Sequence, residues 1–173
     1  MMHSHLPHTD IVGYYQFITF RTFDSTDSFL QKLFMEEKEN SKKQLTADLH
    51  LDESQQGAYL HGEVLSYLND FIINKNQELY QLVAFCIMPN HVHLLIKTLM
   101  PLATMMNIFK GISAKEINNI MNRKGTFWAQ SYYDKAIRDQ KHFDVVYNYI
   151  KNNPSKLIET NTTTPRFYGI YEE

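Results

Sequence analysis

The chain has 173 residues, of which 43% are hydrophobic and 13% aromatic, and its formal net charge at pH 7 is −2. This composition excludes an intrinsically disordered chain and indicates one globular domain with its own core. The single cysteine, Cys86, excludes an intrachain disulfide, and no apolar run reaches the length of a membrane span, so we expect no membrane partner and a cytoplasmic location.

Two kinds of segment alternate along the chain after a polar stretch, residues 1–13, that we expect to be a flexible N-terminal arm. Segments rich in β-branched and aromatic residues predict strands at 14–23, 78–89, 91–98 and 125–138. Apolar residues at helical spacing predict helices at 24–40, 58–76, 103–122 and 139–153. The polar residues 41–57 fit a loop or a weak helix.

The predicted order is β-α-β-β-α-β followed by one more helix, which is the plan of an α+β, ferredoxin-like (split β-α-β) antiparallel sheet. Its helices are expected on one face, which leaves the other face free to carry a site. We expect one domain over residues 14–157 and a C-terminal tail over residues 158–173.

Two histidines stand one residue apart in the stretch FCIMPNHVHLLIK. Side chains alternate along a strand, so His91 and His93 share one face and Val92 faces the other way. Two imidazoles on one face can both reach one divalent ion, although two hydrogen-bonded histidines on a partly wet sheet would have the same spacing.

A second group of polar residues lies on the last predicted helix, in YNYIKNNP. Tyr149 and Asn153 are four residues apart and therefore stand one above the other. On the helix pattern alone, Tyr149 fits a half-buried packing residue; beside a metal ion and a phosphodiester it could be a nucleophile.

Charge is unevenly distributed along the chain. Residues 24–80 contain 11 acidic and 5 basic residues, whereas residues 101–157 contain 4 acidic and 9 basic residues. A basic half of this kind can bind phosphates locally even on an acidic chain. The candidates for phosphate contacts are Lys110, Lys115, Arg123, Lys124, Lys135, Arg138, Lys141, Lys151 and Lys156. The acidic stretch 36–53 has no role that the pattern assigns.

Four motifs in this order, MPNHVHLLI, SAKEIN, FWAQSYYDKAIRD and YNYIKNNP, resemble the single-tyrosine (Y1, His-hydrophobic-His) transposases of the IS200-like superfamily. The resemblance covers roughly residues 14–157 and is greatest to the REP-associated tyrosine transposases. It implies that Tyr149, on the extra C-terminal helix, is the nucleophile and that Tyr147 is a reserve candidate.

The same resemblance implies that His91, His93 and Asn153 hold a divalent metal ion. An asparagine offers a neutral oxygen, so Mg²⁺ or Mn²⁺ is expected rather than a structural zinc ion. It further implies cleavage and rejoining of single-stranded DNA, at imperfect hairpins, through a 5′-phosphotyrosine, by a monomer or a homodimer.

Three other functions share parts of this pattern. A domesticated protein that binds DNA hairpins without moving them would have the same fold. An RNA-binding sheet module would need stacking aromatics on the two central strands, which are too apolar here. A metallohydrolase would use His91 and His93 without a covalent step.

Overall fold

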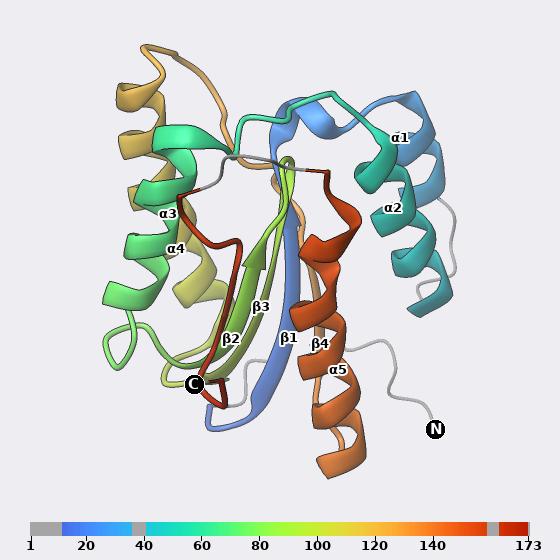
Figure 1. The fold of residues 1–173 in the computed structure, drawn as a ribbon, viewed down its shortest axis with the longest axis vertical. Helices are drawn as coiled ribbons and strands as arrows, with labels where there is room; N and C mark the ends of the chain where they lie inside the picture. Colours follow the sequence, from blue (N-terminus) through green and yellow to red (C-terminus); the bar gives the residue numbers. More distant parts are fainter. Residues whose placement is uncertain (1–11, 36–40, 159–162, 173) are drawn as a thin grey trace.

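The computed structural model describes residues 12–35, 41–158 and 163–172, in which five strands form one antiparallel sheet in the order β4-β1-β3-β2-β5 (Figure 1). The strands are β1 (Tyr15–Arg21), β2 (Tyr80–Ile87), β3 (His91–Thr98), β4 (Tyr133–Ala136) and β5 (Phe167–Gly169). The α-helices are α1 (Ser28–Phe34), α2 (Ser41–Glu53), α3 (Gly62–Asn74), α4 (Leu102–Ile120) and α5 (Gln140–Asn152). Two short 3₁₀ helices, η1 (Phe23–Ser25) and η2 (Asn153–Lys156), complete the described elements.

The two faces of the sheet are covered by different helices, as the alternation of side chains along β3 requires. Val92, Leu94 and Ile96 are fully buried in the large core under α3 and α4. Leu95 points the other way, into a smaller core closed by Ile150 of α5. The fold is therefore the predicted α+β, ferredoxin-like plan with an additional C-terminal helix. The face that we expected to be free is covered by that helix, α5, because its apolar stripe packs on the sheet.

Helix α5 lies along the second face because its sequence gives it a cap and an apolar stripe. The Asp139 side chain accepts a hydrogen bond from the backbone N–H of His142 at 2.8 Å and so caps the first turn. Val146, Tyr147 and Ile150 are its buried residues, and their spacing of three and four places them towards the sheet.

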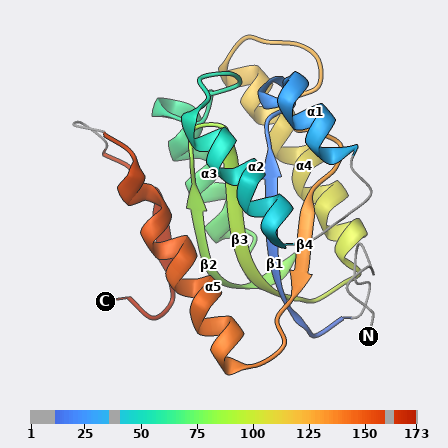
Figure 2. The ribbon, with the colours of Figure 1, turned by 90° about the vertical axis from the view of Figure 1, so that its right-hand side faces the viewer.

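Residues 41–57, for which the sequence fitted a loop or a weak helix, contain a regular 13-residue helix, α2. Together with α1 it lies on the same side of the sheet as α5 (Figure 1 and Figure 2). Ala47 and Leu51 are its buried apolar residues, and they pack on Leu30 of α1. So few apolar contacts leave a faint hydrophobic period, which is why the sequence pattern left the choice between loop and helix open.

The C-terminal segment of the described residues belongs to the sheet. Residues 167–169, which the sequence analysis assigned to a C-terminal tail, form β5 and pair with β2. The Arg166 guanidinium just before β5 donates to the carbonyls of Leu60 and Ile87, at 2.9 and 2.8 Å. Residues 1–11 of the expected N-terminal arm lie outside the described residues. Among the helices that are described, none combines the length and the apolar character needed to cross a membrane.

Candidate metal and nucleophile site

The two histidines of β3 lie side by side beneath α5, each fully buried. Each ring has its Nδ1 held by a neighbour: the hydroxyl of Thr19 on β1 lies 2.7 Å from Nδ1 of His93, and Oδ1 of Asn90 lies 2.7 Å from Nδ1 of His91. An amide oxygen can only accept, so His91 carries its hydrogen on Nδ1 and keeps a lone pair on Nε2. Fixing one ring nitrogen in this way orients the other nitrogen towards a metal ion.

The Nε2 atoms of His91 and His93 are buried and have no hydrogen-bond partner among the described residues. The pKa of each imidazole is lowered to about 3, by burial first and, for His91, also by the neighbouring His93. Both rings are therefore neutral at pH 7, the form that binds metal ions. Buried polar atoms rarely go without a partner, so two of them side by side favour a bound ion.

A carboxylate that the sequence analysis missed completes this cluster. Asp48 of α2 contributes one carboxylate oxygen, and His91 and His93 contribute one ring nitrogen each. These three atoms all lie within 4.8 Å of one another. Asp48 is buried, which raises the pKa of its carboxyl. Two imidazoles and a carboxylate form a common ligand set for a divalent ion.

A second carboxylate from the same helix lies beside the pair. Oδ1 of Asp52 is 3.7 Å from Nε2 of His91, and Oδ2 is 2.9 Å from Nζ of Lys156. Asp48 and Asp52 are four residues apart and share one face of α2. That spacing was the available signal in the acidic stretch 36–53, but it points to a site only once those residues are known to be helical.

Tyr149 reaches the same cluster from the opposite element, α5. Its hydroxyl donates to Oδ2 of Asp48 at 2.7 Å, and its ring centroid lies 5.3 Å from that of His93. Burial, followed by the charge and the hydrogen bond of Asp48, raises the pKa of the Tyr149 phenol far above its ordinary value. The phenol is therefore protonated in the metal-free protein, and it points at the histidines of its own chain.

Asn153 follows Tyr149 by one helical turn, at the start of η2, and is almost fully buried. Its amide lies close enough to the phenol to favour the charged form of Tyr149, but it does not form a hydrogen bond of ordinary geometry. Neither its oxygen nor its nitrogen has a partner among the described residues. An unpartnered buried amide oxygen next to this cluster fits a metal ligand.

Tyr147, the reserve candidate for the nucleophile, is engaged elsewhere. Its hydroxyl donates to Oε2 of Glu172 at 3.2 Å and accepts the backbone N–H of Tyr171 at 3.3 Å. Its hydroxyl oxygen also occupies the space that a Cβ at Gly169 of β5 would need. The Tyr147 hydroxyl therefore bonds the C-terminal segment, whereas the Tyr149 hydroxyl bonds Asp48 of the candidate metal site.

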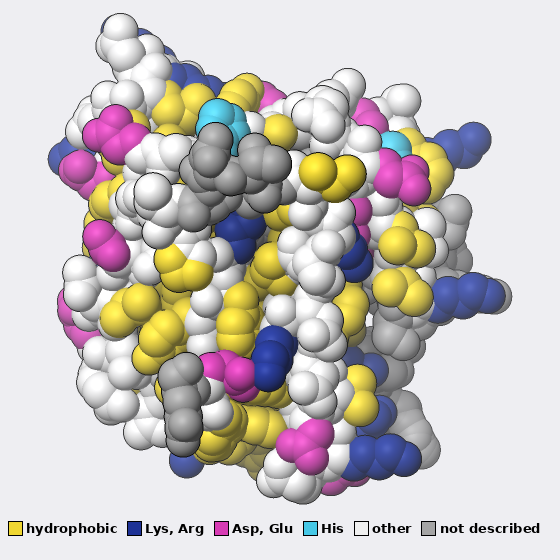
Figure 3. All heavy atoms as spheres, in the orientation of Figure 1, with side chains coloured by type: hydrophobic (Ala, Val, Ile, Leu, Met, Phe, Trp, Pro, Cys, Tyr) yellow, Lys and Arg dark blue, Asp and Glu magenta, His cyan; other side chains and the backbone are white. Residues whose placement is uncertain are grey.

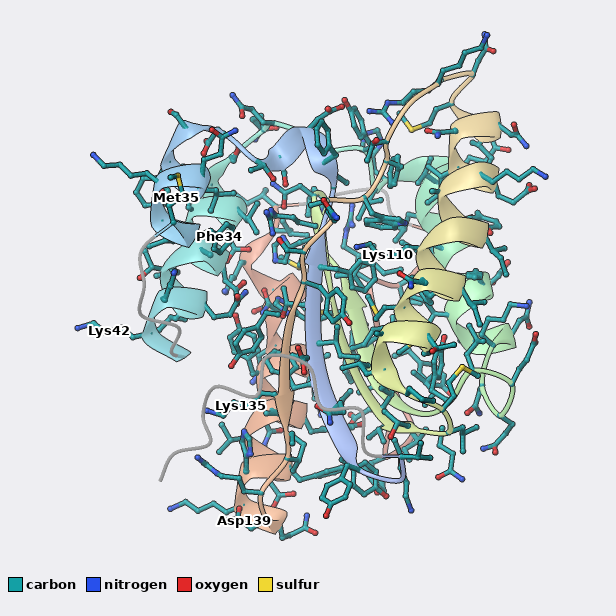
Figure 4. All side chains as sticks on the ribbon, turned by 180° about the vertical axis from the view of Figure 1, so that it is seen from behind. Phe34, Met35, Lys42, Lys110, Lys135 and Asp139 are labelled. Atoms are coloured by element: carbon teal, nitrogen blue, oxygen red, sulfur yellow. The ribbon has the colours of Figure 1, made fainter. Side chains whose placement is uncertain are left out.

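Four of the basic residues predicted to bind phosphates have partners within the chain. Lys110 donates to the carbonyls of Ala129 and Gln130 at 2.6 and 3.0 Å, and burial lowers its pKa to about 8. Lys110 accordingly lies between α4 and the loop before β4 (Figure 4). The other three form ion pairs, namely Arg123 with Asp24 at 2.7 Å, Lys151 with Glu172 at 2.6 Å and Lys156 with Asp52 at 2.9 Å.

The other predicted phosphate contacts remain candidates. Lys115, Lys124, Arg138 and Lys141 are exposed, and Lys135 on β4 is half-buried. On the face shown in Figure 3, several Lys and Arg side chains lie along the right-hand edge, and others lie in the centre and at the upper left, with acidic side chains among them.

Comparison with known proteins shows the family of this chain. A family model described as "Transposase IS200 like" matches residues 42–153. A REP-associated tyrosine transposase solved bound to a REP hairpin is 16% identical with a TM-score of 0.51, over 90% of this chain and 74% of its own, which shows a shared fold. A candidate transposase from Deinococcus radiodurans R1 is 17% identical with a TM-score of 0.49, over 88% of this chain and 97% of its own. No curated protein matches the sequence. Because the family model matches more than half of the chain's 173 residues, the chain belongs to the IS200-like transposase family.

Proposed function

We propose that the protein is a metal-dependent nuclease and strand transferase that cleaves single-stranded DNA at imperfect hairpins and holds one end as a 5′-phosphotyrosine. One observation carries the proposal. The Tyr149 hydroxyl is hydrogen-bonded to Asp48 within the same buried cluster that contains the unpartnered Nε2 atoms of His91 and His93. A packing tyrosine would not need a hydrogen bond to a carboxylate that is grouped with two neutral imidazoles within 4.8 Å.

The ligands of the ion would be His91, His93 and Asp48, with the oxygen of Asn153 as the fourth. A set of two nitrogens and two oxygens suits Mn²⁺, and its oxygens suit Mg²⁺. A divalent ion bound there would supply positive charge that polarises the scissile phosphate.

The chain's own residues perform the covalent step. Oη of Tyr149 attacks phosphorus, its proton leaves through the hydrogen bond to Asp48, and the bond from phosphorus to the 3′ oxygen breaks. The released 3′ oxygen takes a proton and leaves as a hydroxyl. A second 3′-hydroxyl can then reverse the step, and the phosphotyrosine keeps the bond energy, so no nucleotide cofactor is needed. Since one chain supplies every group, the reaction does not require the tyrosine of a second copy.

The IS200-like family and the hairpin-bound relative support DNA hairpins as the substrate. The test is covalent trapping. Purified protein is mixed with Mn²⁺ and end-labelled single-stranded hairpins taken from the flanks of its gene, and the products are separated on a denaturing gel.

We expect a protein–DNA band that disappears in Tyr149→Phe and in His91→Ala but persists in the matched control Tyr147→Phe. Cleavage that survives Tyr149→Phe would instead indicate a metallohydrolase. Hairpin binding without cleavage across the whole panel would indicate a domesticated DNA-binding protein.

A further inference from the structure

Lys156 occupies a position at the site that the reaction outlined above does not use. It is the last residue of η2, and its Nζ lies 5.7 Å from the ring centroid of Tyr149 and 2.9 Å from Oδ2 of Asp52. Its side chain is 39% exposed and that of Asp52 is 10% exposed, whereas His91 and His93 are fully buried. The ammonium therefore lies at the solvent side of the buried cluster, which is the side from which DNA would arrive.

A cation in this place is unfavourable for the metal site. Nζ of Lys156 lies 2.9 Å from Oδ2 of Asp52, whose Oδ1 lies 3.7 Å from Nε2 of His91, so its positive charge would repel a divalent ion bound at the histidines. Asp52 offsets part of this repulsion, since its other oxygen, Oδ1, has no hydrogen-bond partner and lies 3.7 Å from Nε2 of His91. A lysine that repels the ion is best explained by an anion that contacts both the lysine ammonium and the ion.

The scissile phosphate is such an anion. When Tyr149 attacks phosphorus, the phosphate must lie against the tyrosine hydroxyl. That hydroxyl is hydrogen-bonded to Asp48 of the same cluster. Negative charge on the non-bridging oxygens grows as the new bond forms, and a fixed cation beside them stabilises the transition state more than the bound substrate. A lysine is suited to this task because its ammonium can turn its three N–H groups towards a phosphate oxygen.

We propose that Lys156 is a catalytic residue that binds a non-bridging oxygen of the scissile phosphate, and that Asp52 holds its ammonium beside Tyr149 until DNA binds. The proposal rests on the proposed function and adds a group to it. Lys156 takes no part in the proton transfers, so the covalent step remains the one already written. The ion pair with Asp52 is exchanged for an ion pair with the phosphate.

Two simpler explanations predict different behaviour. If Lys156 serves only to neutralise Asp52, removal of both charges would restore what removal of the lysine loses. If Lys156 is one of many backbone contacts to DNA, its loss would weaken hairpin binding as the loss of an exposed lysine such as Lys115 does, and the chemical step would be unchanged.

The experiment measures the single-turnover rate of covalent adduct formation at saturating hairpin and Mn²⁺. The variants are Lys156→Ala, Lys156→Arg, Asp52→Asn, the double variant Asp52→Asn/Lys156→Ala, and Lys115→Ala as the matched control. Hairpin affinity is measured separately in a Tyr149→Phe background, in which no cleavage occurs.

We expect Lys156→Ala to slow adduct formation about 100-fold to 1,000-fold, the loss typical for removal of one donor to a developing oxyanion. Lys156→Arg and Asp52→Asn should stay within about tenfold of wild type, and the double variant should be as slow as Lys156→Ala. Hairpin affinity should change no more than in Lys115→Ala, and Mn²⁺ should bind Lys156→Ala at least as tightly as wild type, which also shows that the site is folded.

Recovery of the rate in the double variant would overturn the proposal in favour of simple neutralisation of Asp52. So would a rate for Lys156→Ala equal to that of Lys115→Ala. If wild-type protein forms no adduct, the proposed function fails and this inference fails with it; if wild type is active and Lys156→Ala matches it, only this inference fails.

Discussion

Replacing Asp48 with asparagine should change the stability of the metal-free protein and its response to metal in opposite directions. The carboxylate is buried, and burial raises its pKa, so the folded state disfavours its charge. A neutral amide of the same shape removes that cost and can still accept the hydrogen bond of Tyr149. In EDTA at pH 7 we therefore expect Asp48→Asn to be at least as stable as wild type.

The response to Mn²⁺ should decrease, because a charged ligand is lost from a group whose members lie within 4.8 Å of one another. An ion at 100 times its dissociation constant stabilises the folded state by about 2.7 kcal/mol. Loss of a residue that only orients a ligand can already weaken metal binding about 100-fold. If Asp48→Asn weakens Mn²⁺ binding about 100-fold, the same Mn²⁺ concentration stabilises the folded variant by only about 0.4 kcal/mol. For a domain of this size the difference corresponds to a Tm shift about 5–9 °C smaller than that of wild type.

The assay is thermal unfolding with EDTA and then with a series of Mn²⁺ concentrations. Asp70→Asn, at an exposed position of α3, makes the same chemical change away from the site and should behave as wild type. An Asp48→Asn protein with an undiminished Mn²⁺ shift would refute the assignment of Asp48 as a ligand and would leave Asn153 as the third ligand.

Three further outcomes follow from the same contacts. Thr19→Val keeps the volume but removes the hydroxyl at Nδ1 of His93, and it should weaken Mn²⁺ binding by about 10-fold to 100-fold in calorimetry; unchanged affinity would mean that packing alone orients the ring. The folded pKa of His93, about 3, lies below its ordinary value of 6.5, so between these pH values the unfolded state binds more protons and stability falls as the pH falls. Urea titrations in EDTA should show that His93→Gln reduces this pH slope by up to about 1.4 kcal/mol per pH unit, and an unchanged slope would contradict a neutral buried imidazole. Lys110→Ala should lower the free energy of unfolding by about 1–3 kcal/mol because two carbonyls lose their donor, and it should affect hairpin affinity no more than Lys115→Ala; a selective loss of affinity would restore Lys110 as a DNA contact.

Much of the fold could be read from local patterns because those patterns are periodic. The strands predicted at 78–89 and 91–98 contain β2 and β3, and the helices predicted at 58–76, 103–122 and 139–153 match α3, α4 and α5. Alternation within β3 was sufficient to place His91 and His93 on one face, which carries Leu95 and lies under α5. Helical spacing was sufficient to place Asn153 one turn after Tyr149.

The patterns failed where an element is short or buries polar groups. β5 has three residues, too few for a period, and its place in the sheet depends on pairing with β2, which lies more than 80 residues earlier. The basic residues were also misleading as a group, since composition cannot show that the ammonium of Lys110 faces backbone carbonyls.

The sequence by itself determined the order of the elements other than α2 and β5, the shared face of His91 and His93, and the helical turn that relates Tyr149 to Asn153, because each depends on residues close together along the chain. Only the tertiary structure decided that Asp48 and Asp52 lie at the histidines, since packing of α1 on α2 and a hydrogen bond from Asn90 to the carbonyl of Leu51 hold α2 there. Contacts between residues about 40 and 100 positions apart join the acidic helix, the histidine strand and the tyrosine helix. The chemistry of the site is set by these distant contacts, and no local period in the sequence records them.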